Sequence, residues 1–184
     1  MSDVLARLER SNAVLLVVDV QEKLLPAMEA AEACVAGVRK IVEAMKVLEV
    51  PTLVTEQYPA GLGRTCAPIR ESLGEVAAVE KVRYSACVEG ITEQLAKLSR
   101  RQVIVVGVET HVCVQQTVLD LLRSGYAAYV CADAVSSRRS LDRETALARM
   151  RQAGAVVTTV ESVIFEMLGE AGTECFKKIL RIVK

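Results

Sequence analysis

Aromatic residues are scarce in this chain of 184 residues: they make up 3% of it, and tryptophan is absent. A core with so few rings has to be filled by Val, Leu, Ile and Ala, which the 52% hydrophobic content supplies. A chain of this length suits one sizeable core, so we predict a single domain over residues 1–184.

Histidine is scarcer still, because His111 is the only one, and this excludes the usual multi-histidine zinc site. The six cysteines (34, 66, 87, 113, 131 and 175) include no CxxC pair, so reduced thiols are the simplest interpretation. No Gly-rich phosphate-binding pattern of the GxGxxG or P-loop type occurs either. We therefore expect no metal and no cofactor.

An excess of charge of one sign is also lacking, since Lys plus Arg and Asp plus Glu both total 23 and neither forms a long block. This gives no electrostatic basis for binding nucleic acid or an anionic membrane, so a small molecule is the expected partner. The first ten residues lack the apolar core of a signal peptide, and the apolar run at 13–18 is too short to span a membrane. We predict a cytoplasmic protein.

Along the chain, continuous runs of apolar residues alternate with segments in which apolar residues recur at helical spacing. Continuous runs predict buried strands at 13–18, 52–55, 76–81, 103–106, 126–131 and 155–160. Three- and four-residue spacing predicts helices at 29–49, from about 87 to 98, after 113, at 141–153, and two short ones in 162–184. Segments 56–68 and 136–140 are expected to be loops. The alternation predicts an α/β fold, a three-layer α/β/α sandwich with a six-stranded, mostly parallel sheet.

Cys113 lies where the strand predicted at 103–106 turns into the next helix. Unpaired backbone N–H groups and the helix dipole stabilise a thiolate at such a position, and this makes a cysteine nucleophilic. Alternatively, Cys113 is a small packing residue, because free cysteines are usually buried and inert.

Asp19 and Lys81 each end a predicted strand. The carboxyl ends of parallel strands meet at one edge of the sheet, where ligand sites of open α/β sheets form. An acid, an amine and the thiol of Cys113 would then share one crevice. For Asp19 the alternative is a helix cap or a satisfied ion pair, and for Lys81 it is an ordinary solvated side chain.

Four segments carry a resemblance to a known family: VVDVQEKLLPAM (17–28), VTEQYPAGLG (54–63), VEKVRYSAC (79–87) and GVETHVCVQQT (107–117). In this order they resemble the isochorismatase-like cysteine hydrolases, a superfamily that includes nicotinamidases and N-carbamoylsarcosine amidohydrolase. The resemblance implies a catalytic triad of Asp19, Lys81 and Cys113. It also implies an oxyanion hole made by the backbone N–H groups of Glu109 and Cys113, with a cis peptide bond between Val108 and Glu109.

Five further residues are candidates for the substrate pocket, by matching position or by their place in loops after strands: Gln21, Gln57, Tyr58, Leu62 and Tyr84. The sequence EQYP stands where nicotinamidases carry metal-ligand histidines, so the resemblance points to a metal-free branch. His111 is open to three interpretations: a pocket wall, a residue at a subunit boundary, or the partner of Cys113 in a Cys–His dyad.

The expected reaction is hydrolysis of the C–N bond of a small amide or ureido compound through a Cys113 thioester, with Asp19 as base and Lys81 as electrostatic stabiliser. Two alternatives remain open. One is a binding or redox-responsive protein that uses Cys113 as a reactive thiol; the other is a vinyl-ether hydrolase of the isochorismatase type. Similar proteins are commonly homo-oligomers, and we expect the same here.

Overall fold

A computed structural model describes residues 7–184. Its sheet has the strand order β3-β2-β1-β4-β5-β6, and every neighbouring pair is parallel. The strands are β1 (Ala13–Val18), β2 (Thr52–Gln57), β3 (Ala78–Lys81), β4 (Gln102–Val108), β5 (Ala127–Ser136) and β6 (Val156–Thr158). The predicted α/β fold is confirmed, and the sheet is parallel throughout rather than mostly so.

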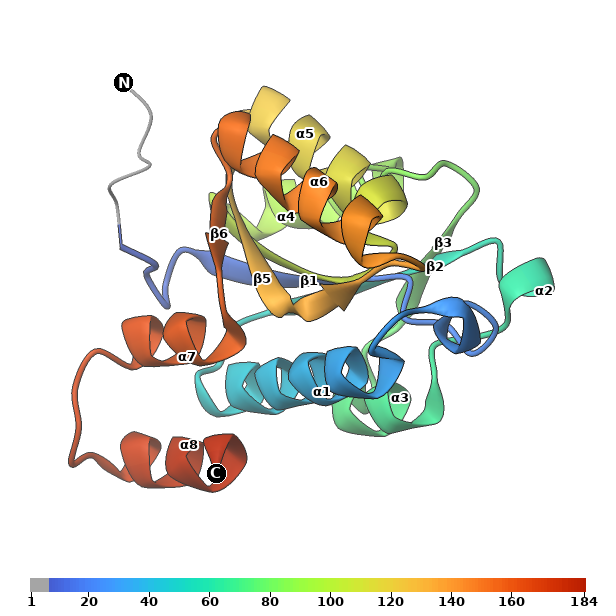
Figure 1. The fold of residues 1–184 in the computed structure, drawn as a ribbon. Coiled ribbons are helices and arrows are strands. Elements are labelled where there is room, and N and C mark those ends of the chain that lie inside the picture. The colour runs from blue at the N-terminus through green and yellow to red at the C-terminus, as the bar shows by residue number, and fades with distance from the viewer. Residues whose placement is uncertain (1–6) are drawn as a thin grey trace.

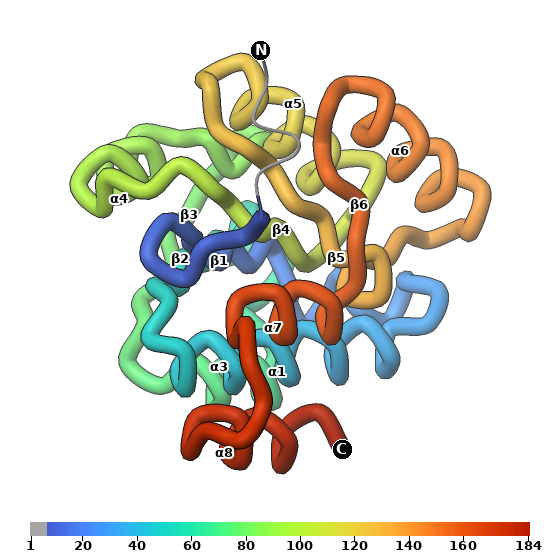
Figure 2. The backbone as a smooth tube through the Cα atoms, turned by 90° about the vertical axis from the view of Figure 1, so that its left-hand side faces the viewer, coloured from blue at the N-terminus to red at the C-terminus, as the bar shows by residue number. Residues whose placement is uncertain are grey.

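Helices cover both faces of the sheet (Figures 1 and 2). One face carries α4 (Glu89–Leu98), α5 (Gln115–Arg123) and α6 (Ser140–Gln152). The other carries α1 (Ala31–Val47), α3 (Ala67–Leu73) and α7 (Val160–Leu168), with α8 (Glu174–Val183) as the outermost layer. In residues 7–184 no helix is both long enough and apolar enough to cross a membrane.

Two hydrophobic cores result, because parallel strands that are covered on both faces are apolar at successive positions. All residues of β1 and β4 are buried. Leu15 and Val17 pack with α1, α3, α7 and α8, while Leu16 and Val18 pack with α4, α5 and α6. Aliphatic side chains fill both cores, as the scarcity of aromatic residues predicts.

One predicted loop and one predicted strand end differ from the structure. Segment 56–68 holds the one-turn helix α2 (Pro59–Leu62) and the start of α3, because Pro59 and Pro68 occupy first-turn helix positions that need no N–H donor. Strand β5, predicted to end at residue 131, continues to Ser136. A register shift between Val105 and Gly107 lets it pair again with the end of β4.

The strand order reverses between β1 and β4, and the crevice outside the carboxyl ends of two such strands is where α/β sheets bind ligands. Gly107 lies opposite Val18 at this point and has a φ of +118°. A Cβ atom on Gly107 would lie 2.0 Å from the carbonyl oxygen of Val18. Only glycine therefore allows β1 and β4 to approach so closely beside Asp19.

We predict that Gly107→Ala lowers the free energy of unfolding by about 3 kcal/mol or more, because the added carbon collides with rigid backbone. Gly125→Ala is the matched control, since Gly125 also has a positive φ (+79°) but nothing within 4 Å of the added atom. The control should lose about 1 kcal/mol. Urea unfolding of both variants measures the difference, and equal losses would contradict the close-approach argument.

Candidate active site

A fully buried ion pair joins the ends of β1 and β3. Lys81 Nζ lies 2.7 Å from Asp19 Oδ2, and neither side chain is exposed to solvent. Asp19 leaves β1 with a φ of 52°, a left-handed conformation that aspartate tolerates better than most residues. Strand β2 lies between β1 and β3 and pairs with both, so the ion pair spans the end of β2.

The ammonium group of Lys81 is saturated with acceptors. Besides Asp19, it donates to Gln57 Oε1 at 2.7 Å and to the carbonyl oxygens of Arg83 (3.1 Å) and Tyr84 (2.9 Å). An ammonium group has three protons, so no donor is left over for a ligand. This network suits a fixed positive charge, because it occupies every proton of the Lys81 ammonium group.

The carboxylate of Asp19 accepts a second hydrogen bond on its other oxygen, from Thr55 Oγ1 at 2.8 Å. Burial raises the pKa of Asp19, while the charge of Lys81 and the hydrogen bonds of Lys81, Thr55 and Cys113 oppose that shift. The carboxylate is thus held in contact with the thiol and with a partly compensated charge, as a general base requires.

Cys113 lies in a π-helical turn, η3 (Thr110–Val114), that joins β4 to α5. Burial and then the negative charge of Asp19 raise the pKa of the thiol to about 12, although Lys81 works in the opposite direction. This corrects the expectation of a preformed thiolate, because the helix-start position is outweighed by burial next to a carboxylate. Cys113 rests as a thiol that donates its hydrogen bond to Asp19.

The peptide bond from Val108 to Glu109 is cis, as the resemblance implies. The backbone N–H of Glu109 forms a hydrogen bond with the sulfur of Cys113, and this bond favours the thiolate form. A donor that reaches the nucleophilic sulfur also lies near the atoms that the sulfur would attack. The oxyanion role of Glu109 and Cys113 remains a prediction that this arrangement supports.

The predicted pocket residues Gln21 and Gln57 are both buried, and their amide groups hold the framework together. Gln21 Nε2 donates to the carbonyl oxygens of Gln57 (2.9 Å) and Gly63 (2.7 Å), and its Oε1 accepts from Gln57 N at 2.7 Å. Gln57 accepts from Lys81 and donates to the carbonyl oxygen of Val82 at 2.8 Å. The amide groups of both glutamines thus position Lys81 and the loops, and their contact with substrate stays a prediction.

A family model described as "Isochorismatase domain" matches residues 13–162, a range that holds the whole site. The chain belongs to the isochorismatase family. It is 40% identical over 185 residues to the secreted isochorismatase effector Isc1 of Phytophthora sojae, an alignment that covers 98% of this chain and 88% of that protein. The resemblance seen in the four sequence segments is confirmed, and the family supports a hydrolase.

Two solved structures of isochorismatase-like fold are similar over nearly the whole chain. The MAR1 ribonuclease of Caenorhabditis elegans has a TM-score of 0.92 and 38% identity, and covers 97% of this chain and 92% of its own. YcaC of Pseudomonas aeruginosa, solved with hexane-2,5-diol and covalent acrylamide, has a TM-score of 0.88 and 25% identity, covering 96% and 91%. Both agree with the parallel architecture described above.

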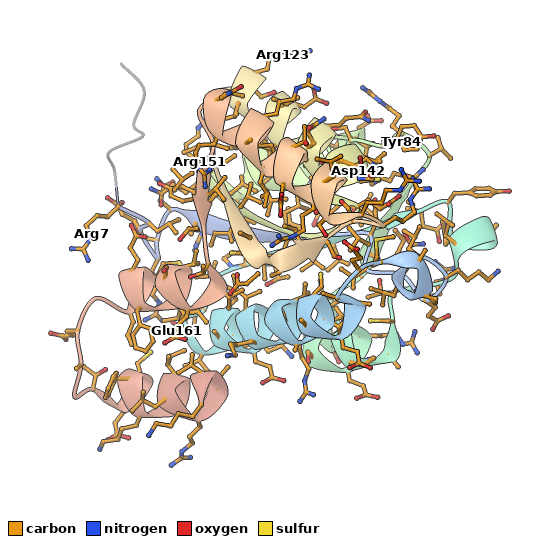
Figure 3. The ribbon with its side chains drawn as sticks, in the orientation of Figure 1. Arg7, Tyr84, Arg123, Asp142, Arg151 and Glu161 are labelled. Carbon is orange, nitrogen blue, oxygen red and sulfur yellow. The ribbon has the colours of Figure 1, made fainter. Side chains whose placement is uncertain are left out.

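The remaining pocket candidates of this isochorismatase-family protein lie farther out. Tyr58 is 56% exposed and Tyr84 57% exposed, and Figure 3 shows Tyr84 near the margin of the molecule. Leu62 is half-buried in α2. The imidazole of His111 pairs through Nδ1 with Ser137 Oγ at 3.0 Å, whereas the thiol of Cys113 pairs with Asp19. These partners argue against a Cys–His dyad.

Two buried threonines with roles in the site were missed in the sequence. Thr55 holds Asp19, and the strand pattern carries a signal for it, because Thr55 is the polar residue that pairs with Val18 in the parallel register. Thr117 Oγ1 donates to the carbonyl oxygen of Cys113 at 2.6 Å and accepts from Ala86 N at 2.8 Å. It ties the turn of Cys113 to the loop after β3.

Among residues 7–184, no cluster of histidine, cysteine and acidic side chains is arranged to hold a metal ion.

We predict that Lys81→Met destabilises the protein by about 3 to 5 kcal/mol at pH 8, because Asp19 becomes a buried charge without its partner. In the variant the folded-state pKa of Asp19 lies above the unfolded value, so the ionised carboxylate is the disfavoured form. The loss is fully present above the folded-state pKa and disappears as the pH falls below the unfolded-state pKa.

Denaturant unfolding of Lys81→Met from pH 8 down to pH 4 measures this dependence. The control is Asp19→Asn/Lys81→Met, which lacks both charges and should recover most of the loss at pH 8. If the stability difference between Lys81→Met and this double variant does not change with pH, the charge of Asp19 is not the cause of the loss.

Proposed function

We propose that the protein hydrolyses the C–N bond of a small amide or ureido compound through a thioester on Cys113. The observation that carries this proposal is the convergence of Asp19, Lys81 and the Glu109 N–H on the Cys113 thiol. A thiol alone is a weak nucleophile at neutral pH when its pKa is raised to about 12, so it needs a base in contact with it. Asp19 is that base.

In the first half-reaction the sulfur of Cys113 attacks the carbonyl carbon as Asp19 takes the thiol proton. The negative charge moves to the carbonyl oxygen, which accepts hydrogen bonds from the backbone N–H groups of Glu109 and Cys113. When the tetrahedral intermediate collapses, Asp19 gives its proton to the departing nitrogen, and a thioester remains.

In the second half-reaction Asp19 removes a proton from water, which attacks the thioester carbonyl carbon. The carbon–sulfur bond then breaks, the proton returns to the sulfur of Cys113, and the acid is released. Lys81 does not move a proton in either half, because all its hydrogens are held by Asp19, Gln57 and two carbonyl oxygens. It keeps the carboxylate ionised and offsets the charge that passes between sulfur and oxygen.

The redox-responsive alternative receives less support than hydrolysis. Peroxide oxidises the thiolate form, and a thiol whose pKa is raised to about 12 is almost entirely protonated at neutral pH. A vinyl-ether hydrolase is also less well supported, because the relatives of that type characteristically do not rely on a nucleophilic cysteine. The pairing of Cys113 with Asp19 would have no function in that reaction.

The two similar structures bear on this proposal. One is called a ribonuclease, so RNA belongs among the compounds to be tested, although this chain has a formal net charge of zero. The other contains covalent acrylamide, an electrophilic amide. We propose that acrylamide likewise modifies this chain, at Cys113.

We further propose that the protein acts in the cytoplasm as a homo-oligomer. Free thiols persist in a reducing compartment, and all six cysteines are unpaired. Tyr58, Val82 and Tyr84 expose large apolar side chains that a neighbouring subunit could cover.

We predict that the wild type releases ammonia or amine from at least one member of a panel of small amides and ureido compounds. Cys113→Ala should lower this rate at least about 1,000-fold, because the nucleophile is removed. Cys87→Ala, which removes a half-buried thiol in the loop after β3, is the matched control and should retain turnover. Mass spectrometry of intact protein should detect the acyl adduct in quenched reactions.

A vinyl ether and RNA complete the panel. Turnover that survives in Cys113→Ala, or turnover of the vinyl ether or RNA alone, would contradict the proposed function.

Asp19→Asn should separate reactivity from turnover. The charge and the hydrogen bond of Asp19 both raise the pKa of Cys113, whereas Lys81 lowers it. The variant should therefore have a lower pKa at Cys113, and iodoacetamide should modify the thiol at lower pH than in the wild type. Amide turnover should nevertheless fall at least about 100-fold, since nothing protonates the departing nitrogen.

The control is Glu161→Gln, which removes a carboxylate from the surface of α7 (Figure 3) and should leave both properties unchanged. Alkylation that shifts to higher pH in Asp19→Asn would contradict the assigned electrostatics.

A further inference from the structure

The residue that supplies the proposed oxyanion donor also carries a negative side chain. The carboxylate of Glu109 is mostly buried, with 13% of its side chain exposed. Its Oε2 accepts a hydrogen bond of 2.8 Å from Nε of Arg138, whose side chain is 58% exposed. Arg138 lies in the segment between β5 and α6, so the pair links the end of β5 to the turn that holds Cys113.

The covalent structure of glutamate keeps this carboxylate within about 10 Å of the sulfur of Cys113. A glutamate carboxyl group lies at most about 6 Å from its own backbone nitrogen. The N–H on that nitrogen reaches the sulfur of Cys113. Cys113 itself is 5% exposed, so charges around it are weakly screened by solvent. An unpaired carboxylate here would repel a thiolate, an oxyanion or an anionic substrate.

We infer that Arg138 is a positioning residue that cancels the charge of Glu109 and so determines which charges the Cys113 site accepts. Arg138 does not touch the reacting atoms and acts through Glu109. The inference rests on the proposed function, because it concerns the oxyanion formed there. It also identifies a substrate property: the site admits compounds that carry a negative group, which an unpaired Glu109 would exclude.

Like Arg64–Glu56, the pair contains a buried glutamate, and it differs from the arginine–glutamate contacts in which both side chains are exposed. In Arg39–Glu43 and Arg10–Glu49 both side chains are well exposed, and such pairs contribute little. Glu109 is mostly buried, so loss of Arg138 leaves a carboxylate without its cation at the start of the turn that holds Cys113. Loss of Arg138 would also loosen the loop after β5. The test therefore has to separate the unpaired charge of Glu109 from this loosening.

The preference of Cys113 for a neutral or an anionic alkylating reagent separates the charge effect from the loosening of the loop. Iodoacetate is an anion and iodoacetamide is neutral, yet both form the same type of bond with a thiol. The ratio of their rate constants at Cys113 reports local charge, whereas loosening changes both rates together. Peptide mass spectrometry at pH 7.5 and low salt gives the two rate constants for wild type, Arg138→Gln, Glu109→Gln/Arg138→Gln and Arg139→Gln.

We expect the ratio of iodoacetate to iodoacetamide to fall about fivefold or more in Arg138→Gln, because Glu109 is then an unpaired anion. The double variant lacks both charges and should return to within about twofold of the wild type. Arg139→Gln removes the charge of an exposed neighbour, and within residues 7–184 Arg139 forms no ion pair. It should leave the ratio unchanged.

The outcomes distinguish this inference from the proposed function. A normal ratio in Arg138→Gln, or a ratio that stays low in the double variant, overturns the role of Arg138 and leaves the proposed function intact. An equal fall in Arg139→Gln also overturns it, because the effect would then be one of general surface charge. Amide turnover that survives in Cys113→Ala overturns the proposed function and this inference with it, because no oxyanion would then form beside Glu109.

Discussion

The buried pair of Asp19 and Lys81 is the interaction on which the rest of the site depends. Two charges without any contact with solvent are tolerated only when their remaining hydrogen-bonding groups are satisfied. Thr55 and Gln57 meet this need from β2, and the carbonyl oxygens of the loop after β3 complete it. The ion pair therefore holds the ends of β1, β2 and β3 in one arrangement, and that arrangement places the carboxylate against the thiol.

The pair also decides the state of Cys113. In the ion pair Asp19 carries a negative charge and Lys81 a positive charge, and the thiol of Cys113 adds none, so the three groups are neutral together. In the proposed reaction a proton passes from sulfur to Asp19 while negative charge passes to the carbonyl oxygen. The net charge of the site does not change, and a dry interior disfavours any reaction in which it does. A raised thiol pKa is thus compatible with nucleophilic attack.

Much of this was predictable from the sequence. The alternation of apolar runs with helical spacing predicted a six-stranded, mostly parallel sheet. Two strand ends and the start of a helix predicted that Asp19, Lys81 and Cys113 lie together. The satisfied amides of Gln21 and Gln57 were not predictable, because their partners are carbonyl groups whose positions depend on the folded loops. The contact of Glu109 with Arg138 joins residues 29 positions apart and follows from the continuation of β5 to Ser136, which no periodicity marked.

The site divides into a rigid part and a variable part. Asp19, Lys81 and Cys113 come from strand ends and the start of a helix, and buried neighbours lock their positions. Tyr58, Leu62 and Tyr84 come from connections outside the sheet, where substitutions disturb little packing. Chemistry that depends on charges placed within 3 Å needs the rigid part, whereas the choice of substrate needs only a rim of suitable shape and polarity. One set of strand ends can therefore serve relatives with different substrates, and the proposed function assigns the choice of substrate to this outer part of the site.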